Sequence, residues 1–218
     1  LQMQERRREQ PVLQLDPMGK PVTVPEEFWA DIRKRDLNLI STVSLADVEE
    51  NLRLSFQFLD RIIVVDVENQ QLLERISGEE IPLDNPLLVR VVLTYFRTVD
   101  RLFPMGKDLI STKDMKQAFY FSGENGLRKE PLLRRFQDDF GQLVRAGQHL
   151  GGEKIDLADL AVVLYPFPRV AVYYLVWEGD EHEIPRLSIL FDRSVEDVFS
   201  PPVIWGLVNV VNAYLINI

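Results

Sequence analysis

The last eighteen residues, 201–218, read PPVIWGLVNVVNAYLINI and contain no charged side chain. Ser200 can cap a helix here, with Pro201 at its first position, where a backbone N–H is not needed. A helix without charge on any face has to be buried in a core, at a subunit interface or in a membrane. Lipid is disfavoured because three amides would need partners there, those of Asn209, Asn212 and Asn217. We therefore expect a core or subunit-interface helix and no membrane span.

The composition is that of an ordinary globular protein. The chain has 218 residues, of which 46% are hydrophobic and 27% charged, enough to bury a large core. Its net charge of -9 repels a phosphate backbone, so nucleic acid is not an expected partner. The chain has no cysteine, which excludes disulfides, thiolate metal sites and cysteine-held iron–sulfur clusters within it. Without a signal-like segment we expect a cytoplasmic protein, although the start at Leu1 rather than Met leaves a preceding leader open.

Residues 1–24 are expected to form an extended, proline-rich arm. Four prolines fall within residues 11–25, and they remove backbone donors and hold the preceding residues extended. The arm is either a surface linker or a segment that docks on a partner. Residues 25–218 are expected to form a single α+β domain.

Helical spacing of apolar residues predicts three further helices. The first begins at Pro25, with Glu26 and Glu27 in its first turn. The second is capped by Asn85 and runs until Pro104 ends it. The third carries its apolar face from Leu132 to Val144 and stops at Gly151-Gly152.

Alternation and β-branched residues predict strands in two regions. Residues 52–58 alternate and pair with the run 62–65 in a hairpin. Residues 160–165, 170–177 and 187–191 predict an antiparallel meander, with Pro166-Phe167-Pro168 ending the first of these strands. The expected fold class is α+β, an antiparallel sheet made of the hairpin plus the C-terminal meander and packed by about four helices.

The stretch WEGDEHEIPRLSILFDRS, residues 177–194, contains the densest group of candidate site residues. One interpretation is a hairpin whose acids keep its turn solvated, with a salt bridge and a cap at its end. The other is a hard-cation site, since carboxylates suit magnesium, manganese or calcium, and two histidines in the chain are too few for a multi-imidazole site. The partner- or ligand-binding candidates are Trp177, Asp180, Glu183, Asp192 and Arg193, and the metal candidates are Asp180, Glu181, His182 and Asp192.

A second candidate lies in the long connection 104–131. Ser122 to Gly126 is followed by Arg128 and Lys129, and backbone amides with two cations can hold an anion. The segment lacks the spacing of a P-loop or a dinucleotide turn, so a plain turn is the alternative. The candidate residues here are Phe121, Asn125 and Arg128.

The blocks WEGDEHEIP and LFDRS, together with Leu150-Gly151-Gly152, Phe119-Tyr120-Phe121 and Pro168-Arg169, resemble an uncharacterised family of anaerobic bacteria and archaea, the domain of unknown function DUF3786. The resemblance covers about residues 25–218. Some members resemble fusions to a small iron–sulfur domain that accompanies corrinoid proteins. The resemblance therefore implies an accessory role in anaerobic one-carbon metabolism, with any corrinoid or iron–sulfur cofactor on a partner, since this chain has no cysteine.

Two functions are consistent with these features. The first is a non-catalytic accessory or binding module without a cofactor of its own, which docks a partner protein or a bulky cofactor. Its contact surfaces would be the N-terminal arm and the C-terminal helix, in a homo- or hetero-oligomer. The alternative is a carboxylate-based, metal-dependent hydrolase in which Asp180, Glu181, Glu183 and Asp192 bind a cation and His182 acts as acid or base.

Overall fold

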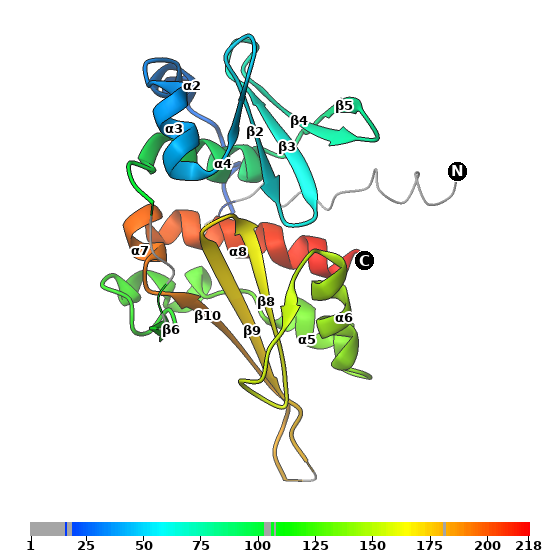
Figure 1. Ribbon diagram of the computed structural model, residues 1–218. Coiled ribbons are helices and arrows are strands. Elements are labelled where there is room, and N and C mark those ends of the chain that lie inside the picture. Colours follow the sequence, from blue (N-terminus) through cyan, green and yellow to red (C-terminus); the bar gives the residue numbers. More distant parts are fainter. Residues whose placement is uncertain (1–15, 17–18, 103–105, 107, 181) are drawn as a thin grey trace.

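The architecture is α+β, as predicted, with two five-stranded antiparallel sheets and helices packed between and around them (Figure 1). It is seen in a computed structural model that describes residues 16, 19–102, 106, 108–180 and 182–218. Buried apolar side chains from both sheets and from the helices form one hydrophobic cluster. Of the expected arm, the end is described, and there Val22 is buried in this cluster with Val24 packed against it. The rest of the arm lies outside the described residues.

The predicted hairpin is the centre of the first sheet, whose strands follow one another in chain order. The hairpin turn is at Leu59-Asp60, between the two predicted strands. It is one residue shorter than the gap between them, because Arg61 already belongs to β3 and pairs with Phe58. Three further strands were not predicted, because their apolar residues are few and do not alternate cleanly. The sheet comprises β1 (Asp47–Glu49), β2 (Arg53–Phe58), β3 (Arg61–Asp66), β4 (Gln71–Ile76) and β5 (Glu79–Pro82).

The helices α2 (Glu26–Arg33), α3 (Leu37–Ser44) and α4 (Pro86–Thr98) accompany this sheet. The start of α4 is as predicted, because the Asn85 side chain accepts a hydrogen bond from the backbone N–H of Leu88 at 3.1 Å. Its end is earlier than predicted. Val99 is extended and fully buried, so leaving the helix there places this side chain in the core.

The second sheet contains the predicted meander. Its order is β6-β10-β9-β8-β7, and its strands are β6 (Leu109–Ile110), β7 (Glu153–Lys154), β8 (Leu160–Phe167), β9 (Val170–Trp177) and β10 (Arg186–Asp192). The prediction that Pro166 ends its strand was wrong. Instead β8 continues to Phe167 through a shift of register between Leu164 and Phe167, an irregularity at which a strand tolerates proline.

The predicted third helix is two helices, α5 (Glu130–Phe136) and α6 (Gly141–His149). The break falls just before Gly141, where a Cβ would approach the Asp139 carboxylate to 2.8 Å. The long connection before α5 contains two 3-10 helices, η1 (Ala118–Phe121) and η2 (Gly123–Asn125), and α7 (Val195–Val198) follows β10.

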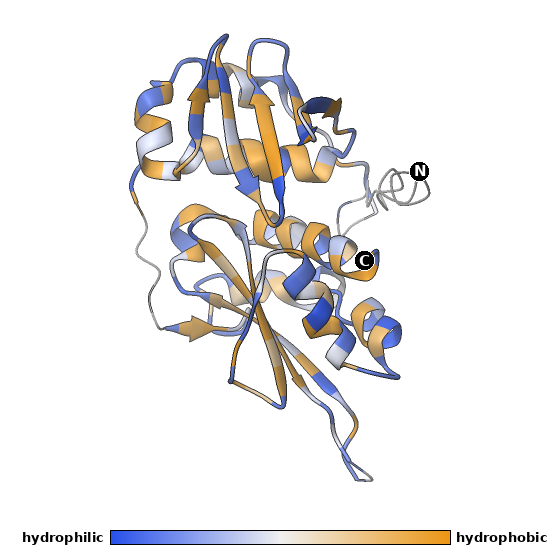
Figure 2. Cartoon of the chain, turned by 45° about the vertical axis from the view of Figure 1, so that its right-hand side comes forward, coloured by the Kyte–Doolittle hydropathy of each residue, from blue (hydrophilic) through white to orange (hydrophobic). Residues whose placement is uncertain are grey.

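The uncharged C-terminal segment is α8 (Pro201–Ile216), which lies between the two sheets as an apolar layer (Figure 2). All of its residues are buried except Pro202, Ala213 and Ile216, so it offers no apolar face to a second subunit. The Asn212 amide is satisfied inside the core, because it accepts from the Tyr174 hydroxyl at 2.7 Å and donates to the Arg128 carbonyl at 2.9 Å. The prediction of a core helix is confirmed, and no helix in the described part of the chain is long and apolar enough to cross a membrane.

Candidate docking site on the β9–β10 hairpin

The hairpin of β9 and β10 extends past its neighbours and forms the lower end of the molecule in Figure 1. Trp177 pairs with Arg186 as the last ladder pair, and the described residues 178–180 and 182–185 belong to the loop beyond it. The adjacent strand β8 reaches only as far as the partner of Val176. Ile184 near the tip is 83% exposed. The hairpin is therefore a projecting element with an apolar side chain in solvent.

Local hydrogen bonds stabilise the tip of the hairpin, and they give Asp180 a structural role there. One oxygen of its carboxylate accepts from the backbone N–H of His182 at 2.7 Å and of Glu183 at 3.0 Å, and its own N–H donates to the Glu183 carbonyl at 3.0 Å. Gly179 has a φ of 77°, and a Cβ there would collide with the Glu183 carbonyl oxygen. The hairpin interpretation of this stretch is supported, since Asp180 forms the turn.

Asp180→Ala should open this turn with little effect on global stability, about 1 kcal/mol or less, because the loop is exposed. The backbone amides of His182 and Glu183 should exchange with solvent several-fold faster, which NMR hydrogen exchange measures. Asp180→Asn is the matched control, because its side-chain oxygen can still accept both bonds. Equal effects of the two variants would show that the negative charge is required and would favour the cation site.

Asp192 and Arg193 lie at the other end of β10. One Asp192 oxygen accepts from the Ser194 N–H at 2.9 Å, while the other is buried without a hydrogen-bond partner among the described residues. Arg193 Nε contacts the Asp108 carboxylate at 2.5 Å, and this hydrogen bond raises the pKa of the guanidinium. The predicted combination of a salt bridge and a cap is confirmed here.

The metal candidates do not converge. Asp180 lies in the loop before β10, and Asp192 is the last of the strand's seven residues. At about 3.3 Å per residue, β10 alone spans roughly 20 Å. Glu181 lies outside the described residues. Within the part of the chain that the structure describes, no three His, Asp or Glu side chains gather in a way that could hold a metal ion. The expected grouping of Asp180, His182 and Asp192 around one cation is thus not seen.

Trp177 is half-buried at the base of the hairpin, where the guanidinium of Arg186 lies 5.8 Å from the centre of its ring. This contact between a flat apolar surface and a cation occurs next to the acidic loop, where Glu183 and Arg186 approach to 4.0 Å. Trp177, Asp180 and Glu183 are consequently brought together by the hairpin. Asp192 and Arg193 are not part of that group.

The second sequence candidate has the features of a plain turn. The backbone N–H of Asn125 donates to the Ser122 carbonyl and that of Gly126 to the Gly123 carbonyl, so these amides are not free for an anion. Phe121 is half-buried in η1, and the guanidinium of Arg128 lies 5.7 Å from the Trp205 ring. These residues therefore contribute to the packing around η1 and α8.

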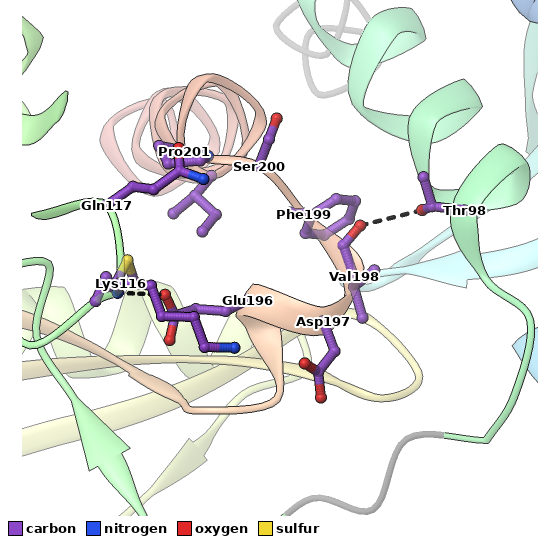
Figure 3. A pocket seen from close by; sticks show the side chains of 11 residues that line it. Thr98, Lys116, Gln117, Glu196, Asp197, Val198, Phe199, Ser200 and Pro201 are labelled. Carbon is purple, nitrogen blue, oxygen red and sulfur yellow. Dashed lines mark hydrogen bonds between the residues drawn. The ribbon is translucent and has the colours of Figure 1, made fainter.

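A cavity of about 290 Å³ lies where α7 joins α8 (Figure 3). Two of its polar groups have partners: the Thr98 hydroxyl donates to the Val198 carbonyl at 3.0 Å, and one Glu196 oxygen accepts from the Lys116 N–H at 2.7 Å. The other Glu196 oxygen is buried without a hydrogen-bond partner among the described residues. The N-terminus of α8 adds no free donors, because it begins with two prolines and the next two N–H groups bond to Ser200. Sequence reasoning did not identify this cavity, because its walls come from segments about 80 residues apart with no shared motif.

Comparison with known proteins identifies the family and adds no named relative. The chain matches none of the curated proteins and none of the solved structures. A family model described as a domain of unknown function, DUF3786, matches residues 36–213. Because this match covers most of the chain and agrees with the resemblance of the WEGDEHEIP and LFDRS blocks, the protein belongs to the DUF3786 family.

Proposed function

We propose that this protein is a non-catalytic accessory module that docks a partner protein through the β9–β10 hairpin. The observation that carries the proposal is Ile184, an 83% exposed apolar side chain on a loop that projects beyond the sheet. Single exposed apolar residues are common, but this one is presented by a turn that Gly179 and Asp180 fix in advance. A preorganised loop loses little conformational entropy on binding, which favours association.

The charge of the loop suggests the character of the partner surface. Glu178, Asp180 and Glu183 are exposed around Ile184, while Arg186 is the one cation at the base. A complementary surface would be an apolar pocket with basic residues at its rim, because opposite charges speed encounter and fix register.

A partner protein is favoured over a bulky cofactor bound within this chain. The cavity beside α7 is at the lower limit of the roughly 300–1,000 Å³ that encloses a drug-sized ligand, and a corrinoid is larger than such a ligand. On the family resemblance, we place the module in anaerobic corrinoid-dependent one-carbon metabolism, with any corrinoid or iron–sulfur group held by the partner. The cytoplasmic location and the lack of a nucleic-acid partner stay predictions from composition.

The alternative, a carboxylate-based metal-dependent hydrolase, has less support. It requires Asp192 to share a cation with Asp180 and Glu183 beside His182, and β10 separates Asp192 from the rest. Each of the two aspartates also has a local structural role, in the tip turn and in the bond to Ser194.

The test is anaerobic capture of partners by the tagged full-length chain in its source cells, with quantitative mass spectrometry of everything retained. We expect a protein recovered in a fixed ratio to the bait, and its recovery should fall about tenfold with Ile184→Asp, because the carboxylate would have to be desolvated in an apolar pocket. The matched control is Leu157→Asp, which places the same charge at an apolar side chain that is 50% exposed elsewhere.

Equal recovery with Ile184→Asp and Leu157→Asp would show that the hairpin is not the docking element. If no protein co-purifies with the wild-type chain in a fixed ratio, the proposed docking function itself is wrong. If the purified chain shows metal-dependent hydrolysis and Asp192→Asn abolishes it, the hydrolase alternative is supported instead.

A further inference from the structure

The edges of the two sheets differ in how they are protected against pairing with another chain. Three of the four marginal strands are short and charged, as natural edges usually are. These are β1 with Asp47 and Glu49, β5 with two glutamates and Pro82, and β7, which has two residues, both charged. The fourth margin is β6, and it covers only the last two residues of β10.

β6 leaves residues 186–190 of β10 uncovered, and after Arg186 this stretch has none of these protections. Residues 187–190 read LSIL, without charge or proline, and pair with β9 in continuous register without a bulge. On the opposite edge, β7 leaves residues 164–167 of β8 uncovered, but these contain Pro166 and the shift of register. An uncharged, regular edge is the kind that accepts an additional strand.

The direction of the backbone groups on this edge follows from the pairing with β6. The N–H of Arg193 donates to the Asp108 carbonyl at 3.0 Å and so points away from β9. Backbone direction in a strand alternates with a period of two, so the N–H and C=O groups of Leu187 and Ile189 also point away from β9. Within the described residues no hydrogen bond to these four groups is present.

A local turn prevents β6 from covering this edge. The Asp114 carboxylate accepts from both the N–H and the hydroxyl of Ser111, at 2.9 and 2.7 Å, and the Asp114 N–H donates to the Ser111 carbonyl. The chain therefore turns away directly after Ile110. The open edge is thus a consequence of a specific turn and lies between that turn and the hairpin loop.

We propose that the partner supplies an extended segment that adds a strand beside β10, bonding to Leu187 and Ile189. This inference rests on the proposed docking function and names the form of the partner. Main-chain hydrogen bonds would provide affinity, while the side chains next to the edge would provide selectivity. The half-buried Ser188 and Leu190 lie on one face of the edge, which suits small and β-branched residues on the added strand.

The charges of the hairpin loop determine which residues suit the end of the added strand that lies toward this loop. Glu178, Asp180 and Glu183 are exposed there, and Arg186 is a single opposing cation. The partner segment should accordingly carry Lys or Arg at that end. Its middle should be uncharged, like the edge that it covers.

The experiment uses the full chain with blocked synthetic peptides of the sequences KKTVTVT and TVTVTKK, which place the lysines at either end, and their EETVTVT and TVTVTEE counterparts. In the free protein the amides of Leu187 and Ile189 should exchange faster than that of Phe191, which β6 covers. One of the lysine peptides should slow both amides at least about threefold at millimolar concentration, and its glutamate counterpart should not. The lysine end that binds reports whether the strand is added parallel or antiparallel.

A charge variant checks the orientation without disturbing the core. Glu183→Lys should weaken the binding of the lysine peptide about threefold at low salt, because an exposed charge pair contributes little more than that. Glu26→Lys, in the first turn of α2, is the control and should leave it unchanged. If neither lysine peptide slows the two amides, strand addition at β10 is wrong.

The outcome is separable from that of the capture experiment. If capture of a partner depends on Ile184 but no lysine peptide slows the Leu187 and Ile189 amides, the docking function is supported and strand addition is contradicted. If a peptide binds at β10 but no partner is captured, the edge accepts a strand and the proposed docking function is contradicted.

Discussion

Phe167→Ala will lower the free energy of unfolding by about 3–5 kcal/mol, the range for removing a large aromatic side chain from a packed core. Phe167 is fully buried where the two sheets meet. Its ring stacks on Tyr95 of α4 at 4.3 Å between ring centres and on Phe56 of β2 at 5.4 Å. It also contacts Phe58 and Phe199. The substitution therefore removes one side chain that joins β2, α4, β8 and the C-cap of α7.

Urea denaturation followed by circular dichroism measures this loss as a shift of the midpoint at constant slope. Phe119→Ala is the matched control, because that phenylalanine is 77% exposed and its loss should change stability by less than about 0.5 kcal/mol. A slope that falls in Phe167→Ala would show that the two sheets unfold separately. Equal effects of the two substitutions would mean that Phe167 does not connect the sheets.

Local sequence signals predicted the elements whose structure depends on nearby residues. The cap at Asn85, the turn after Phe58 and the uncharged α8 each follow from a short stretch of the chain, and the structure contains all three. The Asp180 turn belongs to the same class, since its hydrogen bonds join residues at most three apart. The hairpin part of the candidate site was for this reason predictable.

The elements that were missed depend on contacts between distant residues. The strand β8 continues through Pro166 because Phe167 has to reach the rings of β2 and α4. The end of α4 at Thr98 depends on a hydrogen bond to Val198, a hundred residues away. The open edge of β10 depends on where β6 stops, and a two-residue strand leaves almost no pattern in a sequence.

Gly152→Ala is the second substitution with a large expected effect, about 3 kcal/mol. Gly151 and Gly152 end α6 in a Schellman arrangement, with the Gly152 N–H donating to the Gly147 carbonyl and the Gly151 N–H to the Gln148 carbonyl. A Cβ on Gly152 would lie 2.6 Å from the Val163 carbonyl oxygen and 2.8 Å from the Gly147 carbonyl oxygen. Both obstructing atoms are backbone, so α6 would have to move away from β8.

Alanine substitutions at two other glycines distinguish this steric cost from the general cost of adding a side chain. Gly126→Ala should change the unfolding free energy by less than about 0.5 kcal/mol, because its nearest neighbour is at 3.3 Å and its φ is negative. Gly151→Ala should cost about 1 kcal/mol, because its φ is 79° but the nearest atom is at 3.6 Å. An effect of Gly152→Ala no larger than that of Gly151→Ala would show that α6 can shift on the sheet. If Gly152→Ala costs the most and Gly126→Ala the least, the backbone at the end of α6 contacts the backbone of β8 at this point. This contact stabilises the sheet that carries the hairpin and the open edge of β10.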